Sequence, residues 1–199
     1  CIIFMKLNSK YYILRHGQAV SNVNGICSSW PEKFKNPLTP HGREKIRHTA
    51  EKLKNKNIDI IFTSPILRAK ETAQIVGELL NCRPKQDKRL KEIGFGIFNG
   101  QPIESFHGYF HNENNRAKRK VPRGESYAEV LARVMNFFKE INKKYRGKTI
   151  LIVSHQAPLL LLLGKIKGYS IVESVIPLRT IFNEKRITKG QLVKLNSPS

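Results

Sequence analysis

Cysteine is scarce in this chain, and the few cysteines are far apart. Cys1, Cys27 and Cys82 are an odd number in 199 residues, with no C-x-x-C pair and no neighbouring histidine to complete a zinc site. This spacing argues against the disulfide framework that stabilises many small secreted domains. We expect reduced thiols and no metal centre. We also expect a hydrophobic core that is large enough to stabilise the fold without disulfide or metal cross-links.

Long hydrophobic runs are also absent. The apolar run over residues 1–5 is too short for the hydrophobic region of a signal peptide, and Lys6 follows it. The run Ala157 to Leu163 is far too short to span a bilayer. We therefore expect a cytoplasmic protein that makes no use of a membrane.

Acidic residues are the third shortage. The chain has 15 Asp and Glu against 36 Lys and Arg, so its formal net charge is +21. A field of this sign attracts phosphates, nucleic acids, acidic proteins or anionic lipid. Because 40% of the residues are hydrophobic, the charge does not indicate disorder. Composition leaves two classes open: an enzyme for anionic substrates, or a nucleic-acid binder.

Strand and helix patterns alternate along the first half of the chain. Lys10 to Arg15 and Ile58 to Thr63 are short runs rich in β-branched, aromatic and other apolar residues, as strands are. A helix is predicted from Thr39, as N-cap, with Pro40 in its first position. A second helix is predicted after Ser64-Pro65, with Arg68 near its first turn.

The second half continues the alternation. The predicted elements are a helix from Glu125 or Ser126 to about Tyr145, a buried strand at Thr149 to Ser154, a helix at Pro158 to Leu163, and strands at Ile171 to Ile181 and Gln191 to Leu195. This order predicts an α/β protein, a three-layer α/β/α fold with a mostly parallel central sheet, in one domain over residues 5–196.

One segment does not fit a core pattern. Residues 107–123 are rich in Arg, Lys and Asn, and we expect an exposed basic insertion or lid at about 105–123, with His107 at the surface. Its basic residues lie beside Tyr109 and Phe110, a combination that could also bind nucleic acid.

Polar residues follow three of the predicted strands. These are Arg15-His16, Ser64 leading to Arg68, and Ser154-His155. In parallel sheets ligands bind beyond the carboxyl ends of the strands, so these groups should converge. A buried arginine needs an anion, and a bound phosphate would satisfy two arginines bidentately. A neutral histidine beside that phosphate could attack phosphorus.

Ordered motifs carry a resemblance to a known family. The motifs are Leu14-Arg15-His16-Gly17-Gln18 with Asn22, Leu38-Thr39-x-x-Gly42, Ser64-Pro65-x-x-Arg68-Ala69-x-x-Thr72-Ala73, Leu90-x-Glu92-Ile93-x-Phe95-Gly96, Pro122-x-Gly124-Glu125-Ser126 and Val153-Ser154-His155. Together they resemble the histidine phosphatases, the superfamily that contains phosphoglycerate mutase. A lone R-H-G would be a weak signal, whereas six blocks in order are a specific one.

The resemblance implies a role for each matching residue. His16 is the nucleophile that forms a phosphohistidine, Glu92 is the proton donor, Asn22 lies at the rim, and the transferring phosphoryl group is surrounded by Arg15, Arg68 and His155. Two guanidiniums and an imidazolium can supply the positioning and charge stabilisation that phosphoryl transfer needs, so no metal or cofactor is implied. Glu92 would protonate the leaving alkoxide and then activate water.

Three readings of the function follow. The one we favour is a metal-independent phosphoric monoester hydrolase of the histidine acid phosphatase type, acting on a small phosphorylated metabolite. A cofactor-dependent phosphoglycerate mutase is the alternative within the family, but the short insertion here leaves less cover to exclude water. A nucleic-acid or acidic-partner binder on the same fold is the alternative outside it.

One departure from the family pattern concerns the segment after His155. Gln156-Ala157-Pro158 stands where the family usually has glycine and other small residues. The resemblance places this backbone close to the phosphate, so the departure concerns how the substrate fits the pocket rather than the identity of the catalytic groups.

Overall fold

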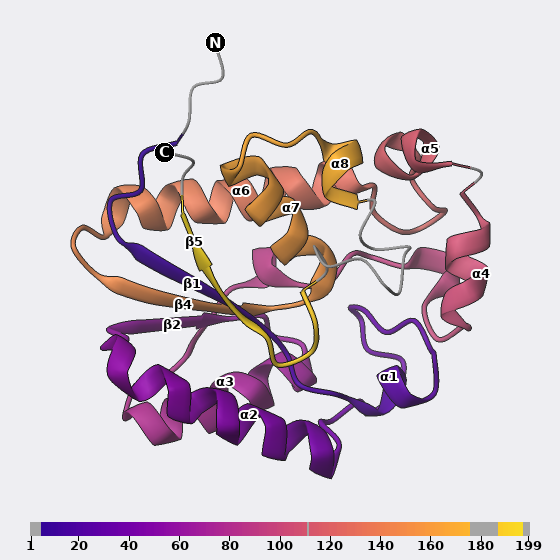
Figure 1. Cartoon of the computed structure of the whole chain (residues 1–199). Coiled ribbons are helices and arrows are strands. Elements are labelled where there is room, and N and C mark those ends of the chain that lie inside the picture. Colours follow the sequence, from indigo (N-terminus) through magenta and orange to yellow (C-terminus); the bar gives the residue numbers. More distant parts are fainter. Residues whose placement is uncertain (1–4, 111, 176–186, 197–199) are drawn as a thin grey trace.

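A five-stranded sheet organises the part of the chain that the computed structural model describes, which is residues 5–110, 112–175 and 187–196 (Figure 1). The strands are β1 (Lys10–Arg15), β2 (Ile60–Thr63), β3 (Lys85–Gln86), β4 (Thr149–Ser154) and β5 (Leu192–Leu195), in the order β3-β2-β4-β1-β5. β1 to β4 pair in parallel, and β5 runs antiparallel to β1 at the edge. The predicted mostly parallel α/β fold is confirmed.

The central strand β4 is buried on both of its faces. Each of its six residues is buried, as its uninterrupted apolar sequence predicts. It pairs with β1 along the full length of both strands, from Lys10 opposite Thr149 to Arg15 opposite Ser154. This register brings His16 and His155, the next residue of each strand, to the same edge of the sheet.

Helices α2 (Pro40–Leu53) and α3 (Leu67–Leu80) cover one face of the sheet (Figure 1). The expected start of α2 is confirmed, because Thr39 Oγ1 accepts a hydrogen bond from the Gly42 amide and Pro40 is the first helical residue. Apolar side chains of the two helices pack on β1, β2 and β4.

Helices α6 (Tyr127–Lys144) and α7 (Gln156–Ile166) cover the opposite face and contribute to the larger apolar cluster. Ser126 and Glu129 form a reciprocal capping box that fixes the start of α6 within a residue or two of the predicted one. The remaining elements are α1 (Val20–Val23), α4 (Ile103–Gly108), α5 (Glu113–Lys118), α8 (Ile171–Val175) and three short 3-10 turns at Lys54–Lys56, Lys88–Leu90 and Gly96–Phe98.

The segment predicted to be an exposed insertion is largely folded into the protein. It contains α4 and α5, which lie beyond the carboxyl ends of the sheet (Figure 1). Phe106, Phe110, Arg116, Ala117 and Val121 are buried, so the prediction of exposure is wrong for these side chains. Because Phe110 and Arg116 are buried, these two side chains are not on the surface where the alternative of nucleic-acid binding needs them. The lid role stays a prediction.

The strand predicted at Ile171 to Ile181 is also wrong where it can be checked. Residues 171–175 form α8, and residues 176–181 lie outside the described residues. The reason is a capping box: the Glu173 carboxylate accepts from the Ser170 amide, and Ser170 Oγ accepts from the Glu173 amide. This local hydrogen bonding prevails over the strand preference of Ile171 and Val172. In the described parts of the chain, no helix is both long and apolar enough to cross a membrane.

Candidate active site

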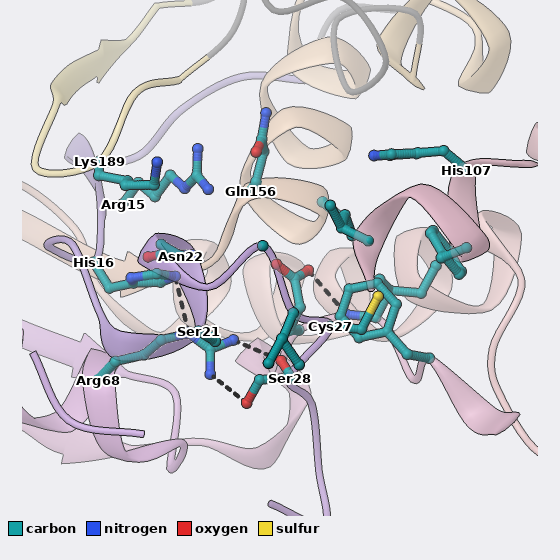
Figure 2. A pocket seen from close by; sticks show the side chains of 18 of the residues that line it. Arg15, His16, Ser21, Asn22, Cys27, Ser28, Arg68, His107, Gln156 and Lys189 are labelled. Atoms are coloured by element: carbon teal, nitrogen blue, oxygen red, sulfur yellow. Dashed lines mark hydrogen bonds between the residues drawn. The ribbon is translucent and has the colours of Figure 1, made fainter. Parts of the chain in front are cut away.

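A cavity of about 180 Å³ opens at the carboxyl edge of the sheet (Figure 2). It is lined by five of the six predicted site residues: Arg15, His16, Asn22, Arg68 and Glu92. These residues come from the end of β1, from α1, from the first turn of α3 and from the loop after Leu90. The sheet topology thus brings together groups that are widely separated in sequence.

Two hydrogen bonds fix the protonation state of His16. Its Nδ1 lies 2.7 Å from the Gly17 carbonyl oxygen, and its Nε2 lies 3.0 Å from Arg68 Nε. A carbonyl only accepts and a guanidinium only donates, so Nδ1 carries the hydrogen and Nε2 presents a lone pair. Burial, together with the guanidiniums of Arg68 and Arg15, holds the pKa of His16 well below its usual range. The imidazole is neutral at pH 7, as a nucleophile must be.

The Gly17 backbone requires the absence of a side chain. A Cβ on Gly17 would lie 2.8 Å from the carbonyl oxygen of Gly42, and a Cβ on Gly42 would lie 2.1 Å from the carbonyl oxygen of Gln18. The Gly17 amide also donates to Thr72 Oγ1 at 3.1 Å. The start of α2 and the first turns of α3 therefore hold the loop that carries His16.

Arg68 lies in the first turn of α3, as predicted, and only 3% of it is exposed. Besides His16, its guanidinium donates to the carbonyl oxygen of Ser28 at 2.9 Å and contacts Ser28 Oγ at 3.4 Å. Ser28 is a positioning residue that sequence reasoning missed, because it lies in an irregular loop without a motif of its own.

Arg15 extends the positive end of the cavity. Its side chain is 6% exposed and donates from Nη1 to the Ile187 carbonyl oxygen at 2.9 Å. Lys189 lines the same cavity, and its charge acts on His16 as that of Arg15 does. Lys189 was not predicted, since its only sequence signal is its place before the last strand. Together with Arg68, these cations form a strongly electropositive end, suited to a phosphoryl group.

His155 is adjacent to His16 but is not one of the described residues that line the cavity. Its ring lies 5.0 Å from the His16 ring, centroid to centroid, at an edge-on angle of 61°. It is fully buried, and its Nε2 lies 2.9 Å from Ser64 Oγ. Burial and the nearby Arg68 hold the pKa of His155 well below its usual range, so the ring is neutral and the expected imidazolium is wrong. His155 and His16 do lie next to each other, as predicted.

Glu92 and Asn22 lie on the other sides of the cavity. Glu92 Oε1 accepts a hydrogen bond from the Ile93 amide at 2.9 Å. Asn22 is half-buried in α1, and its Oδ1 accepts from the Ala19 amide at 3.0 Å. The Glu92 loop is held by Arg133 of α6, which donates to the carbonyl oxygens of Arg89, Lys91 and Glu92. Nothing in the sequence pattern singled out Arg133.

The rest of the cavity wall is mostly apolar. Its apolar lining residues are Ile26, Cys27, Ile93, Phe95, Ile103, Phe106 and Ala157. Burial, with smaller effects from Glu92 and Glu104, raises the pKa of the Cys27 thiol to about 12, so this thiol stays neutral. His107, expected at the surface, lines the cavity as well. That expectation is wrong, because α4 turns the side chain inward.

The segment that departs from the family pattern is part of the wall. Gln156 is the first residue of α7, and both Gln156 and Ala157 line the cavity. Within residues 5–110, 112–175 and 187–196, no group of three or more His, Cys, Asp or Glu side chains is placed to hold a metal ion.

A neutral histidine whose lone pair faces the buried guanidinium of Arg68, with Arg15 lining the same cavity, is suited to the transfer of a phosphoryl group. Comparison with known proteins gives the family. Residues 11–175 match the model of the histidine phosphatase superfamily, branch 1, and the chain belongs to that superfamily. The resemblance seen in the motifs is confirmed.

Three known proteins illustrate the relationship. The chain is 33% identical over 160 residues to the Bacillus subtilis protein named "Uncharacterized phosphatase PhoE", covering 78% of this chain and 76% of PhoE. It is 38% identical over 94 residues to the 2,3-bisphosphoglycerate-dependent phosphoglycerate mutase of Thermoplasma acidophilum, covering 47% of this chain and 46% of the mutase. The solved structure of Bacillus stearothermophilus YhfR superposes with a TM-score of 0.75 at 28% identity, covering 85% of each chain.

Proposed function

We propose that this protein is a metal-independent phosphomonoesterase that hydrolyses a small phosphorylated metabolite through a phosphohistidine at His16. The observation that carries the proposal is the neutral His16 ring, whose Nε2 lone pair faces the buried guanidinium of Arg68. The chain's similarity to a relative named as a phosphatase supports the same reaction class.

In the first step His16 Nε2 attacks phosphorus and the bond from phosphorus to the ester oxygen breaks. Arg15 and Arg68 bind the non-bridging phosphoryl oxygens, which spreads the charge of the transition state. Glu92 gives its proton to the leaving alkoxide, so a neutral alcohol departs. In the second step water attacks the phosphohistidine, Glu92 takes the water proton, and phosphate leaves with His16 restored.

Arg68 changes partners during this reaction. Its Nε donates a hydrogen bond to His16 Nε2, the atom that must attack phosphorus. An arriving phosphoryl group offers Arg68 a charged acceptor in place of the neutral His16 nitrogen, and such charge-assisted hydrogen bonds are the stronger ones. Phosphate binding therefore releases the nucleophile.

The role we propose for His155 is to surround the phosphoryl group together with both arginines. The contact between its ring and the His16 ring, 5.0 Å from centroid to centroid, supports this role.

A phosphoglycerate mutase is the second candidate, supported by the 38% identity to the Thermoplasma mutase. A mutase needs the same pocket but keeps water out while the phosphoryl group returns to the substrate. Incubation with 3-phosphoglycerate, with and without a bisphosphate primer, separates the two. Release of phosphate indicates the hydrolase, and primer-dependent formation of 2-phosphoglycerate indicates the mutase.

The proposal is tested by trapping the intermediate. The full chain is mixed with p-nitrophenyl phosphate in the presence of EDTA, quenched in base, and digested for mass spectrometry. We expect turnover to survive EDTA, and we expect one phosphoryl group on the peptide that contains His16. Loss of activity on chelation, or retained turnover in His16→Ala, would contradict the mechanism.

A further inference from the structure

The cavity has two chemically different ends. Arg15, Lys189 and Arg68 make one end cationic, whereas the side formed by α4 is lined by Ile103 and Phe106. Figure 2 shows His107 on this second side, pointing across the cavity toward Gln156. Of the residues that α4 contributes to the cavity wall, Ile103 and Phe106 are apolar and His107 is the polar one, so His107 is the α4 residue that can recognise a polar atom of the leaving group.

Arg116 determines which hydrogen atoms His107 carries. A guanidinium nitrogen of Arg116 lies 2.8 Å from His107 Nδ1. Arginine has five donors and no acceptor, so His107 Nδ1 must accept this hydrogen bond. The hydrogen of a neutral ring is then on Nε2, so any hydrogen bond that His107 donates comes from that nitrogen.

The position of Arg116 shows that this arrangement is built into the fold. Only 1% of Arg116 is exposed, and its guanidinium lies over the Phe110 ring at 5.2 Å. Burying a guanidinium carries a large desolvation cost compared with an apolar side chain of similar volume. The hydrogen bond between Arg116 and His107 joins α5 to α4, so the direction and the tautomer of His107 are set before a substrate arrives.

We propose that His107 is a specificity-determining residue that donates a hydrogen bond from Nε2 to the leaving group. The substrate class is a phosphomonoester whose alcohol part has an apolar body and, remote from the phosphate, a hydrogen-bond acceptor such as a carbonyl oxygen. This inference rests on the proposed phosphatase function and names the leaving group that it selects.

The test compares matched substrates on the full chain. The probes are linear alkyl phosphates of increasing length and oxoalkyl phosphates of the same lengths, which differ only in one carbonyl. One added hydrogen bond predicts a preference of about tenfold in kcat/KM for the oxoalkyl phosphate at the length that reaches His107. His107→Leu should abolish this preference, and His107→Gln, which keeps an N–H donor, should retain part of it.

Control variants separate the possible failures. His48→Leu, an exposed histidine on α2, should keep the parental preference. A parental ratio in His107→Leu would overturn the role of His107. Turnover that survives in His16→Ala would instead overturn the proposed function, whatever the ratio.

A measurement on the parent protein tests the tautomer without activity. Long-range proton–nitrogen correlation spectra report which ring nitrogen of each histidine carries a hydrogen, and the His107→Gln spectrum assigns the signals. We expect hydrogen on Nε2 alone at pH 7. Hydrogen on Nδ1 would overturn the proposal, even if the leucine variant failed to fold.

Discussion

The two ends of the cavity are built in different ways. At the cationic end, the key side chains follow directly from β1 and from the start of α3, and parallel pairing with β4 fixes their positions. At the α4 side, the lining residues come from short helices and loops outside the sheet. In the proposed mechanism, the sheet end holds the groups that act on any phosphomonoester, and the α4 end contacts the leaving group.

This difference separates rate from selectivity. A change at the cationic end should slow every substrate, because all of them share the phosphoryl group. A change at the α4 end should alter the ranking of substrates, because only the leaving group reaches it. The following expected outcomes test that separation, and they begin with the largest effect.

Arg68→Ala should have the largest effect. Loss of one preorganised donor to a developing oxyanion typically lowers kcat by about 10²- to 10³-fold. Here the same residue also orients His16, so we expect the upper end of that range on all substrates. Arg47→Ala, on the exposed face of α2, is the control and should keep the parental rate. A loss that varied tenfold or more among leaving groups would contradict the assignment of rate to the cationic end and of selectivity to the α4 end.

Glu92→Gln should have a large effect that depends on the leaving group. General acid catalysis contributes about 10²- to 10⁴-fold when the leaving group needs a proton. We expect a loss at the lower end of that range for an alkyl phosphate and a much smaller loss for p-nitrophenyl phosphate, measured as kcat. Equal losses on both would assign the proton transfer to another group.

Ile103→Ala should have a modest and selective effect. Ile103 lines the α4 side of the cavity, and removing about three fully buried methylene equivalents would cost about 50-fold; because Ile103 is only half-buried, we expect about a tenfold loss. We expect the ratio of kcat/KM between a long alkyl phosphate and methyl phosphate to fall by that factor. A uniform loss on both would show that this end also governs the rate.

Lowering the pH should destabilise the fold, because His16 and His155 lie buried at the cationic end. The pKa values of His16 and His155 are both held low in the folded protein, whereas an unfolded histidine titrates at about 6.5. The unfolded state therefore binds more protons as the pH falls below about 6.5. Stability is full above this pH, and each histidine should cost about 1.4 kcal/mol per pH unit below it.

Urea unfolding between pH 7 and pH 5, in buffers free of phosphate, measures this slope. His16→Gln should lower it by about one proton, and His48→Gln is the matched control. The same slope in the parent and in His16→Gln would mean that His16 titrates normally in the folded protein.

The sequence predicted the cationic end far better than the α4 end. His16, Arg68 and His155 follow strands or begin a helix in motifs that parallel pairing must bring together. The inward turn of His107 depended on Arg116 and on the packing of α5, which leave no periodic signal in a basic segment. Ser28 and Arg133 were missed for a similar reason, since they act through backbone carbonyl groups that any sequence supplies.

The prediction of a strand at Ile171 is wrong because of another local effect. Its β-branched residues favour a strand, but the Ser170 and Glu173 capping box determines the structure of this segment. A serine followed three residues later by glutamate was visible in the sequence, and it could have corrected the prediction.

The contact between Arg68 Nε and His16 Nε2 has a consequence for chemical selectivity. An electrophile without negative charge offers the guanidinium no charged acceptor, so it meets a nitrogen whose lone pair is already engaged. In the proposed mechanism, a phosphate ester brings the charge that frees this lone pair. Neutral electrophiles should therefore modify His16 slowly, while its imidazole stays available to anionic phosphate esters.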